Sequence, residues 1–181
     1  MDIMIEFFQL HRELIAQIIG FIAMAIVVIT YQCKSQRKIL ILLMVSAFVW
    51  CVHFLVLGKY TAVLLNLLSA FRCVIYACHS DGKKWAQGVW IPIVFGIVCS
   101  VSTIFTWGGL IDILPLVSTF MYTYSNWQQN ERRLKYITLP ASMCWLVYNI
   151  VGGSVAGAIN EGFAEISIIV YLVRTRKKGY A

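Results

Sequence analysis

The chain has 181 residues, of which 60% are hydrophobic and only 13% are Asp, Glu, Lys or Arg. A soluble domain of this length cannot bury so much apolar surface, so the composition excludes the soluble globular classes and indicates an integral membrane protein. We attribute the formal net charge of +7 to membrane topology and contact with anionic lipids, rather than to nucleic-acid binding.

Seven apolar segments follow one another along the chain, at 14–31, 39–57, 61–78, 89–107, 110–127, 136–151 and 155–173. Each is close to the ~20 residues that cross a hydrocarbon core ~30 Å thick as a helix. Strand-like alternation is absent, so the sequence predicts an all-α integral membrane protein with seven transmembrane helices. Residues before 14 lack a basic start and a small-residue cleavage site, and we expect them to extend the first helix.

Lysine and arginine gather on one side of the predicted membrane. Two of them, Arg12 and Lys59, lie in one set of loops. The opposite set, with the C-terminal tail, holds Lys34, Arg37, Lys38, Lys83, Lys84, Arg132, Arg133, Lys135, Arg174, Arg176, Lys177 and Lys178. Basic loops stay in the cytoplasm, so we predict an N-terminus outside and a C-terminus inside.

An internal repeat organises the segments. Gly58 and Gly153 mark short turns 95 residues apart, and Gln32 and Gln128 occupy matching segment ends 96 residues apart. The sequence therefore predicts one membrane domain with a 3+1+3 parallel repeat, in which repeat one spans 14–79 and repeat two spans 109–174. A linker helix at 85–107 joins the repeats, and a basic tail at 174–181 follows them.

This arrangement, with Gln32 and Gln128 at the cytoplasmic ends of helices one and five, resembles the SWEET and PQ-loop transporter superfamily. The stretches CVHFLVLGKYTA, SAFR, DILPLVSTF and CWLVYNIVGGSVAGAINEG are similar to the bacterial inner-membrane YgjV family, over about residues 18–173. Tyr31 and Trp127 stand where the PQ motif has its proline. The resemblance implies a bacterial inner-membrane location and repeat-motif or gate positions at Gln32 and Gln128.

Four residues are predicted to line a central pocket on the outer side of the membrane midplane. Trp50 precedes Asn66 by 16 residues, and Trp145 precedes Glu161 by the same number. The depths match across the repeat, and the positions resemble the solute-contacting Trp and Asn of SWEET-like proteins. Alternatively, both tryptophans are packing or lipid-facing aromatics. His53, one turn from Trp50, either binds at the pocket mouth or makes interfacial hydrogen bonds.

A second polar pair is predicted deeper in the membrane. Arg72 and Glu165 lie at nearly equal depth in corresponding helices, so an ion pair across the repeat axis would neutralise both charges. Arg72 alternatively extends to the cytoplasmic surface along its apolar stem. Glu161 and Glu165 lie one helical turn apart, and carboxylates at membrane depth are a functional signal.

Two functions of different classes follow. The first is a small-solute transporter that alternates access by rocking one repeat against the other, with Glu161 or Glu165 exchanging a proton. The second is a non-transporting scaffold or regulator that acts through the basic cytoplasmic loops. We expect no enzymatic activity, cofactor, metal or nucleic-acid partner, because catalytic and metal-binding motifs are lacking. Membrane lipids and a small polar solute are the expected partners, and the Gly153-x-x-x-Gly157 spacing permits a homodimer.

Overall fold

In the computed structural model, which describes residues 2–30, 36–127 and 131–178, the protein consists of helices joined by short turns. The long helices are α1 (Asp2–Thr30), α2 (Gln36–Val56), α3 (Tyr60–Ser80), α4 (Trp90–Phe105), α5 (Ile113–Trp127), α6 (Glu131–Val151) and α7 (Val155–Lys178). Two short 3-10 helices, η1 (Lys84–Gln87) and η2 (Leu110–Asp112), precede α4 and α5. The prediction of seven helices is confirmed for these ranges.

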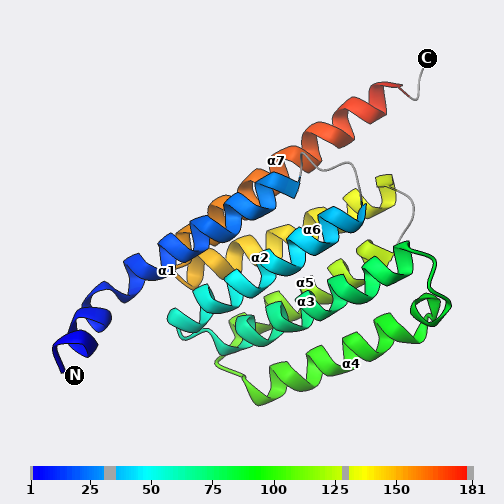
Figure 1. Ribbon diagram of the computed structural model, residues 1–181. Helices are drawn as coiled ribbons and strands as arrows, with labels where there is room; N and C mark the ends of the chain where they lie inside the picture. The colour runs from blue at the N-terminus through cyan, green and yellow to red at the C-terminus, as the bar shows by residue number, and fades with distance from the viewer. Residues whose placement is uncertain (1, 31–35, 128–130, 179–181) are drawn as a thin grey trace.

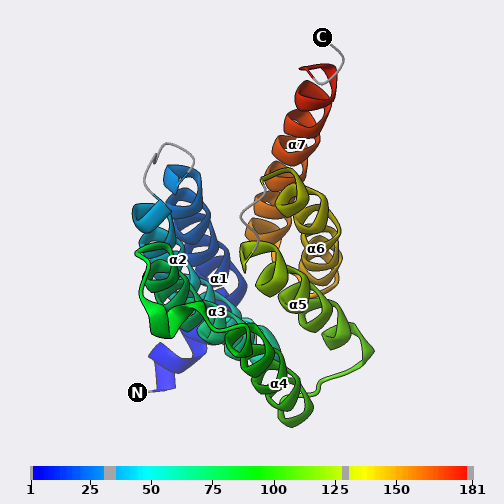
Figure 2. The same ribbon diagram turned by 90° about the vertical axis from the view of Figure 1, so that its right-hand side faces the viewer.

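The helices form two groups of three with α4 beside them (Figure 1). In the first triplet α2 packs along both α1 and α3, and in the second triplet α6 packs along both α5 and α7. The triplets meet where α1 contacts α7 and where α3 contacts α5, while α4 packs against α3 and α5. Figure 2 shows α1 and α7 diverging toward the C-terminal end of α7.

The two ends of the bundle differ in their connections. At one, which we call the turn end, α2 joins α3 through Gly58 and α6 joins α7 through Gly153, with φ of 72° and 75°. Such positive φ angles favour glycine, because a Cβ atom would clash with the backbone. At the opposite end, which we call the basic end, lie the exposed Arg37, Lys38 and Lys83.

The glycine turns close with matching hydrogen bonds. Lys59 N donates to Phe54 O at 2.9 Å and Ser154 N donates to Asn149 O at 2.8 Å, so donor and acceptor are each shifted by 95 residues. Gly58 N and Gly153 N likewise donate to carbonyls three residues earlier. Both turns are Schellman motifs, which satisfy the last carbonyls of α2 and α6. The two turns predicted from the glycine spacing are thus confirmed.

A second pair of hydrogen bonds also repeats with this offset. Ser46 Oγ in α2 donates to Ala23 O in α1 at 3.0 Å, and Ser118 Oγ in α5 donates to Ala141 O in α6 at 2.7 Å. After a shift of 95 residues Ser46 corresponds to Ala141, and Ala23 corresponds to Ser118. The serine donor thus lies on the second helix of the first triplet but on the first helix of the second triplet. The first two helices of each triplet therefore cross at the same place.

Among the described residues, four helices are long and apolar enough to cross a membrane. Their apolar spans are His11–Thr30 within α1, Arg37–Val56 within α2, the whole of α3 (Tyr60–Ser80), and Val155–Arg174 within α7. The apolar α4 is shorter, with 16 residues. The first helix extends back to Asp2, as predicted. The fifth segment was expected to be helical from 110, but α5 begins at Ile113, because Asp112 Oδ2 accepts a hydrogen bond from Gly108 N at 2.7 Å and shapes a 3-10 turn.

Candidate functional site

An aromatic cluster fills the space between α2 and α6 near the turn end. The Phe54 ring centroid lies 5.9 Å from those of Trp50 and Trp145 and 6.4 Å from that of Tyr148. Trp50 is 8% exposed, Phe54 3% and Tyr148 1%, and the small side chains of Ala23, Ala62 and Ala156 complete the core. Both predicted tryptophans thus belong to one cluster, in which Phe54 and Tyr148 were not anticipated.

Gln17 connects the triplets beside this cluster. Its Nε2 donates to Gly153 O at 2.8 Å, and its Oε1 accepts from Ala156 N at 3.0 Å. The side chain of α1 thereby satisfies one carbonyl of the α6–α7 turn and one of the free N–H groups at the start of α7. Close approach is possible because Gly20 lacks a side chain: a Cβ atom there would lie 2.7 Å from that of Ala156.

His53 makes the second polar connection between the triplets. Its side chain is completely buried, with Nδ1 2.6 Å from Ala16 O and Nε2 2.7 Å from Ser154 Oγ. A carbonyl only accepts, so Nδ1 carries the proton and Nε2 accepts from the Ser154 hydroxyl. We call the bonds from Gln17 to Gly153 and Ala156, together with the bond between His53 and Ser154, the inter-triplet latch.

The α2–α3 turn is held differently, so the two sides of the repeat are not equivalent. Thr61, which corresponds to Ala156, donates from Oγ1 to Thr106 O at 2.8 Å, at the end of α4. Asp112, which corresponds to Gln17, bonds within its own loop to Gly108 N. The first triplet therefore holds the α6–α7 turn directly, whereas the α2–α3 side is tied to α4.

Glu161 accepts hydrogen bonds from three side chains of the second triplet. Ser142 Oγ donates to Oε2 at 2.7 Å and Tyr122 OH donates to the same oxygen at 3.4 Å. Asn160 Nδ2 donates to Oε1 at 3.2 Å. Glu161 as a whole residue is half-buried. Three neutral donors surround this carboxylate, and among the described residues no cation lies against it.

Asn66, predicted to face Glu161 across the repeat axis, is half-buried on α3 and donates from Nδ2 to Ala62 O of its own helix at 2.9 Å. The structure gives these two residues different partners. Their assignment to a common solute site, with Trp50, Trp145 and His53, stays a prediction. Gln32 and Gln128 lie outside the described residues.

The predicted ion pair between Arg72 and Glu165 is not formed. Arg72 is 5% exposed and turns toward α5, where its Nη1 donates to Thr123 Oγ1 at 2.6 Å, while Nη2 donates to Ser69 Oγ at 2.8 Å. Oε1 of the half-buried Glu165 has no hydrogen-bond partner among the described residues. Equal depth in corresponding helices was therefore insufficient, because Arg72 is held by Thr123 of α5 and Ser69 of its own helix.

Besides Phe54 and Tyr148, several polar residues of the site were missed by the sequence interpretation. Gln17 lies within an apolar segment, so its polarity was a signal that it bonds to another helix. Ser154, Ser142 and Tyr122 carried no such signal, because serine and tyrosine are common in membrane helices and their partners come from other elements. In the described ranges no three His, Cys, Asp or Glu side chains gather as a metal site would require.

The helical architecture, the apolar spans and the polar groups held between helices define the class of a multi-helix membrane protein. The chain belongs to the Imp-YgjV family of bacterial inner membrane proteins, whose family model matches residues 14–179. It is similar to inner membrane protein YgjV of Escherichia coli (strain K12), with 24% identity over 148 residues, which cover 82% of this chain and 77% of that protein. No solved structure matches the chain.

Proposed function

We propose that this inner membrane protein transports a small polar solute by alternating access, with the first triplet rocking against the second. The observation that carries the proposal is the inter-triplet latch, which joins two similarly packed triplets near the turn end. Farther toward the basic end, Arg72 and Tyr76 of α3 donate hydrogen bonds to Thr123 of α5, at 2.6 and 3.0 Å. The turn end is the outer end in this proposal and the basic end is cytoplasmic, in accordance with the distribution of Lys and Arg. The proposal includes no enzymatic step and no cofactor.

The latch has the strength expected of a reversible contact. It contains three hydrogen bonds between the triplets, through Gln17 and His53. Hydrogen bonds between membrane helices contribute about 0.6 kcal/mol on average and about 1–2 kcal/mol in model peptides. The sum is therefore a few kcal/mol, which is the range that separates a major conformation from a sparsely populated one.

Matched packing of the triplets supports a rocking motion. In the repeat α1 corresponds to α5, and α3 corresponds to α7. The contact of α1 with α7 therefore has its counterpart in the contact of α5 with α3. Glycine turns and serine hydrogen bonds repeat at the same offset of 95 residues. Two rigid units of like architecture, joined at an interface, are the arrangement on which alternating access depends.

Glu161 is the residue that we propose contacts the solute or exchanges a proton with it, with Glu165 as the neighbouring acid. Its carboxylate lies about two helical turns from the start of α7, behind the latch as seen from the turn end. Ser142 and Tyr122 hold it in the second triplet, so a rocking motion would carry it relative to Trp50 and Asn66 on the first. An acid that shares a site with the tryptophans, as this proposal requires, would suit a cationic or polar solute.

Transport currents test this proposal. Proteoliposomes containing the protein are exposed on a solid-supported membrane to a panel of amines, amino acids and sugars. We expect at least one class to give a current that Glu161→Gln abolishes, while Glu13→Gln, which changes an exposed acid near the turn end, leaves it intact. A current that is identical in Glu161→Gln, or the absence of current across the panel, contradicts the proposal and favours a scaffold that acts through its basic loops.

A further inference from the structure

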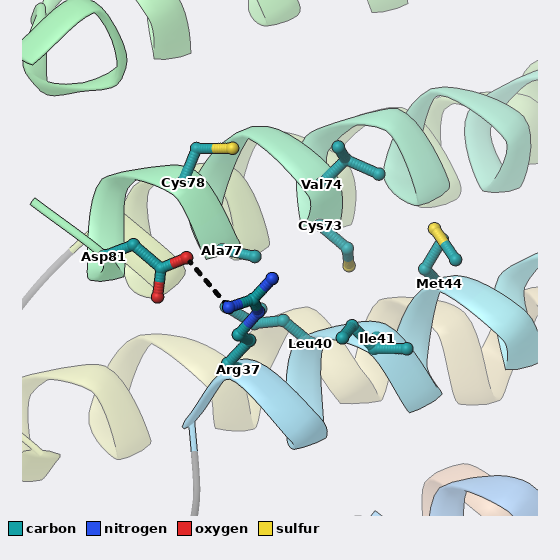
Figure 3. Close-up of a pocket in the computed structure, with 9 residues that line it drawn as sticks. All are labelled: Arg37, Leu40, Ile41, Met44, Cys73, Val74, Ala77, Cys78 and Asp81. Atoms are coloured by element: carbon teal, nitrogen blue, oxygen red, sulfur yellow. Dashed lines mark ion pairs between the residues drawn. The ribbon is translucent and has the colours of Figure 1, made fainter. Parts of the chain in front are cut away.

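A groove between α2 and α3 opens at the basic end, away from the latch and from Glu161. Its cavity volume is about 240 Å³. The walls are mostly apolar, and Figure 3 shows that the polar pair of Arg37 and Asp81 lies at one end of the groove. The other lining residues are Leu40, Ile41, Met44, Cys73, Val74, Ala77 and Cys78.

The charged pair at this end is held loosely. Arg37 Nη1 lies 3.7 Å from Asp81 Oδ2, and the two side chains are 66% and 35% exposed. Charge-assisted hydrogen bonds are shorter, about 2.7–2.9 Å, so within the part of the chain that the structure describes the guanidinium keeps most of its donors free. Arginine presents its donors as a planar fork that matches two oxygens of a phosphate. The groove thus combines an available anion-binding group with an apolar floor.

Neighbouring residues place the mouth of the groove at the membrane surface. Lys38, Lys83 and Lys84 are exposed and add positive charge close to Arg37 and Asp81 in the sequence. Trp85 follows directly and Trp90 comes five residues later, and they are 57% and 60% exposed. Exposed tryptophans are typical of the headgroup region of a bilayer, where one part of the ring is in lipid and another in water.

We propose that this groove binds one anionic phospholipid, with its phosphate on Arg37 and an acyl chain along Leu40, Ile41, Met44 and Val74. Basic pockets between membrane helices bind anionic headgroups by the same combination of charge and apolar contact. At about 240 Å³ the cavity is smaller than the about 300–1,000 Å³ of small-molecule pockets, so it suits part of one chain rather than a whole solute. Asp81 competes with the phosphate for Arg37 and lowers the lipid affinity.

Native mass spectrometry of the detergent-purified protein measures this binding, with phosphatidylglycerol and phosphatidylcholine of identical chains as probes. We expect phosphatidylglycerol to bind at least fivefold more tightly than phosphatidylcholine. Arg37→Gln should remove that preference, and Asp81→Asn should increase it. Ala77→Leu, which fills the groove, should weaken both lipids. Arg12→Gln, a change of the same type near the turn end, should have no effect, and added inorganic phosphate should not displace the lipid.

Three results overturn the proposal. An undiminished preference in Arg37→Gln would place anionic lipid elsewhere on the basic loops. An unchanged or weaker preference in Asp81→Asn would show that Asp81 does not compete for Arg37. Asp81→Asn should gain lipid binding if the proposal is right. It therefore still tests the proposal if Arg37→Gln or Ala77→Leu fails to fold. Displacement by inorganic phosphate would indicate a simple anion site without a chain-binding groove.

Discussion

Replacing Gln17 by leucine removes two of the three hydrogen bonds of the inter-triplet latch. The leucine keeps the apolar part of the side chain but leaves Gly153 O and Ala156 N without their partner on α1. The hydrogen bond between His53 and Ser154 and the packing around Phe54 remain. The substitution therefore weakens the contact between the triplets and leaves the interior of each triplet unchanged.

The expected magnitude follows from the number of bonds lost. At about 0.6–1.5 kcal/mol for each hydrogen bond between membrane helices, loss of two bonds destabilises the closed turn end by about 1–3 kcal/mol relative to the open one. A difference of that size multiplies the population of the open conformation by about 5–150. The wild-type protein should keep the turn end closed, because its remaining contacts include the buried rings of Trp50, Phe54 and Tyr148.

Thiol labelling from the turn end measures this population. Asn66→Cys serves as the reporter in a background without the native cysteines, and a membrane-impermeant thiol reagent is added outside. We expect slow labelling with the intact latch and labelling accelerated by about 5–150-fold with Gln17→Leu. Arg12→Gln on the exposed face of α1 is the matched control and should leave the rate unchanged. Equal rates with and without Gln17, in folded protein, would refute the latch as the contact that closes the turn end.

Three further predictions concern topology, turns and charge. A reporter active only in the cytoplasm and fused to Ala181 should give signal, and signal from a periplasmic reporter would reverse the orientation. Gly153→Ala should destabilise the protein by about 1–2 kcal/mol because of its positive φ, whereas Gly162→Ala in open space within α7 should not, as thermal unfolding in detergent can show. Arg72→Ala and Glu165→Gln should each lower the stability, and the double variant should lose the sum of the two within about 0.5 kcal/mol. A double variant that loses clearly less than the sum would show that the two side chains interact.

The parts of the fold that depend on local chemistry could be predicted from the sequence. Gly58 and Gly153 stand at turns that require positive φ, and their spacing in the sequence predicted that the two turns correspond. Apolar segment length predicted the helices, although α5 began three residues late. The polar capping of that loop by Asp112 depends on Gly108, a contact that hydropathy does not encode.

The contacts between helices could not be predicted in the same way. Depth along the membrane follows from residue counting, but the direction of a side chain around its helix depends on how neighbouring helices pack. Arg72 illustrates the limit, since its depth matches Glu165 while its side chain bonds to Thr123 on α5. His53 was expected at a pocket mouth or an interface and is instead fully buried against Ala16 and Ser154.

The central claim is that the two triplets move as units in opposite senses at the two ends of the bundle. Double electron–electron resonance in lipid nanodiscs measures this directly, with one spin-label pair at positions 14 and 151 near the turn end and another at positions 38 and 173 near the basic end. All four positions are exposed, and each pair joins the first triplet to the second. Gln17→Leu should lengthen the turn-end distance and shorten the basic-end distance. A single, unchanged peak in the distance distribution at both ends would contradict alternating access, and so would a distance that lengthens at both ends.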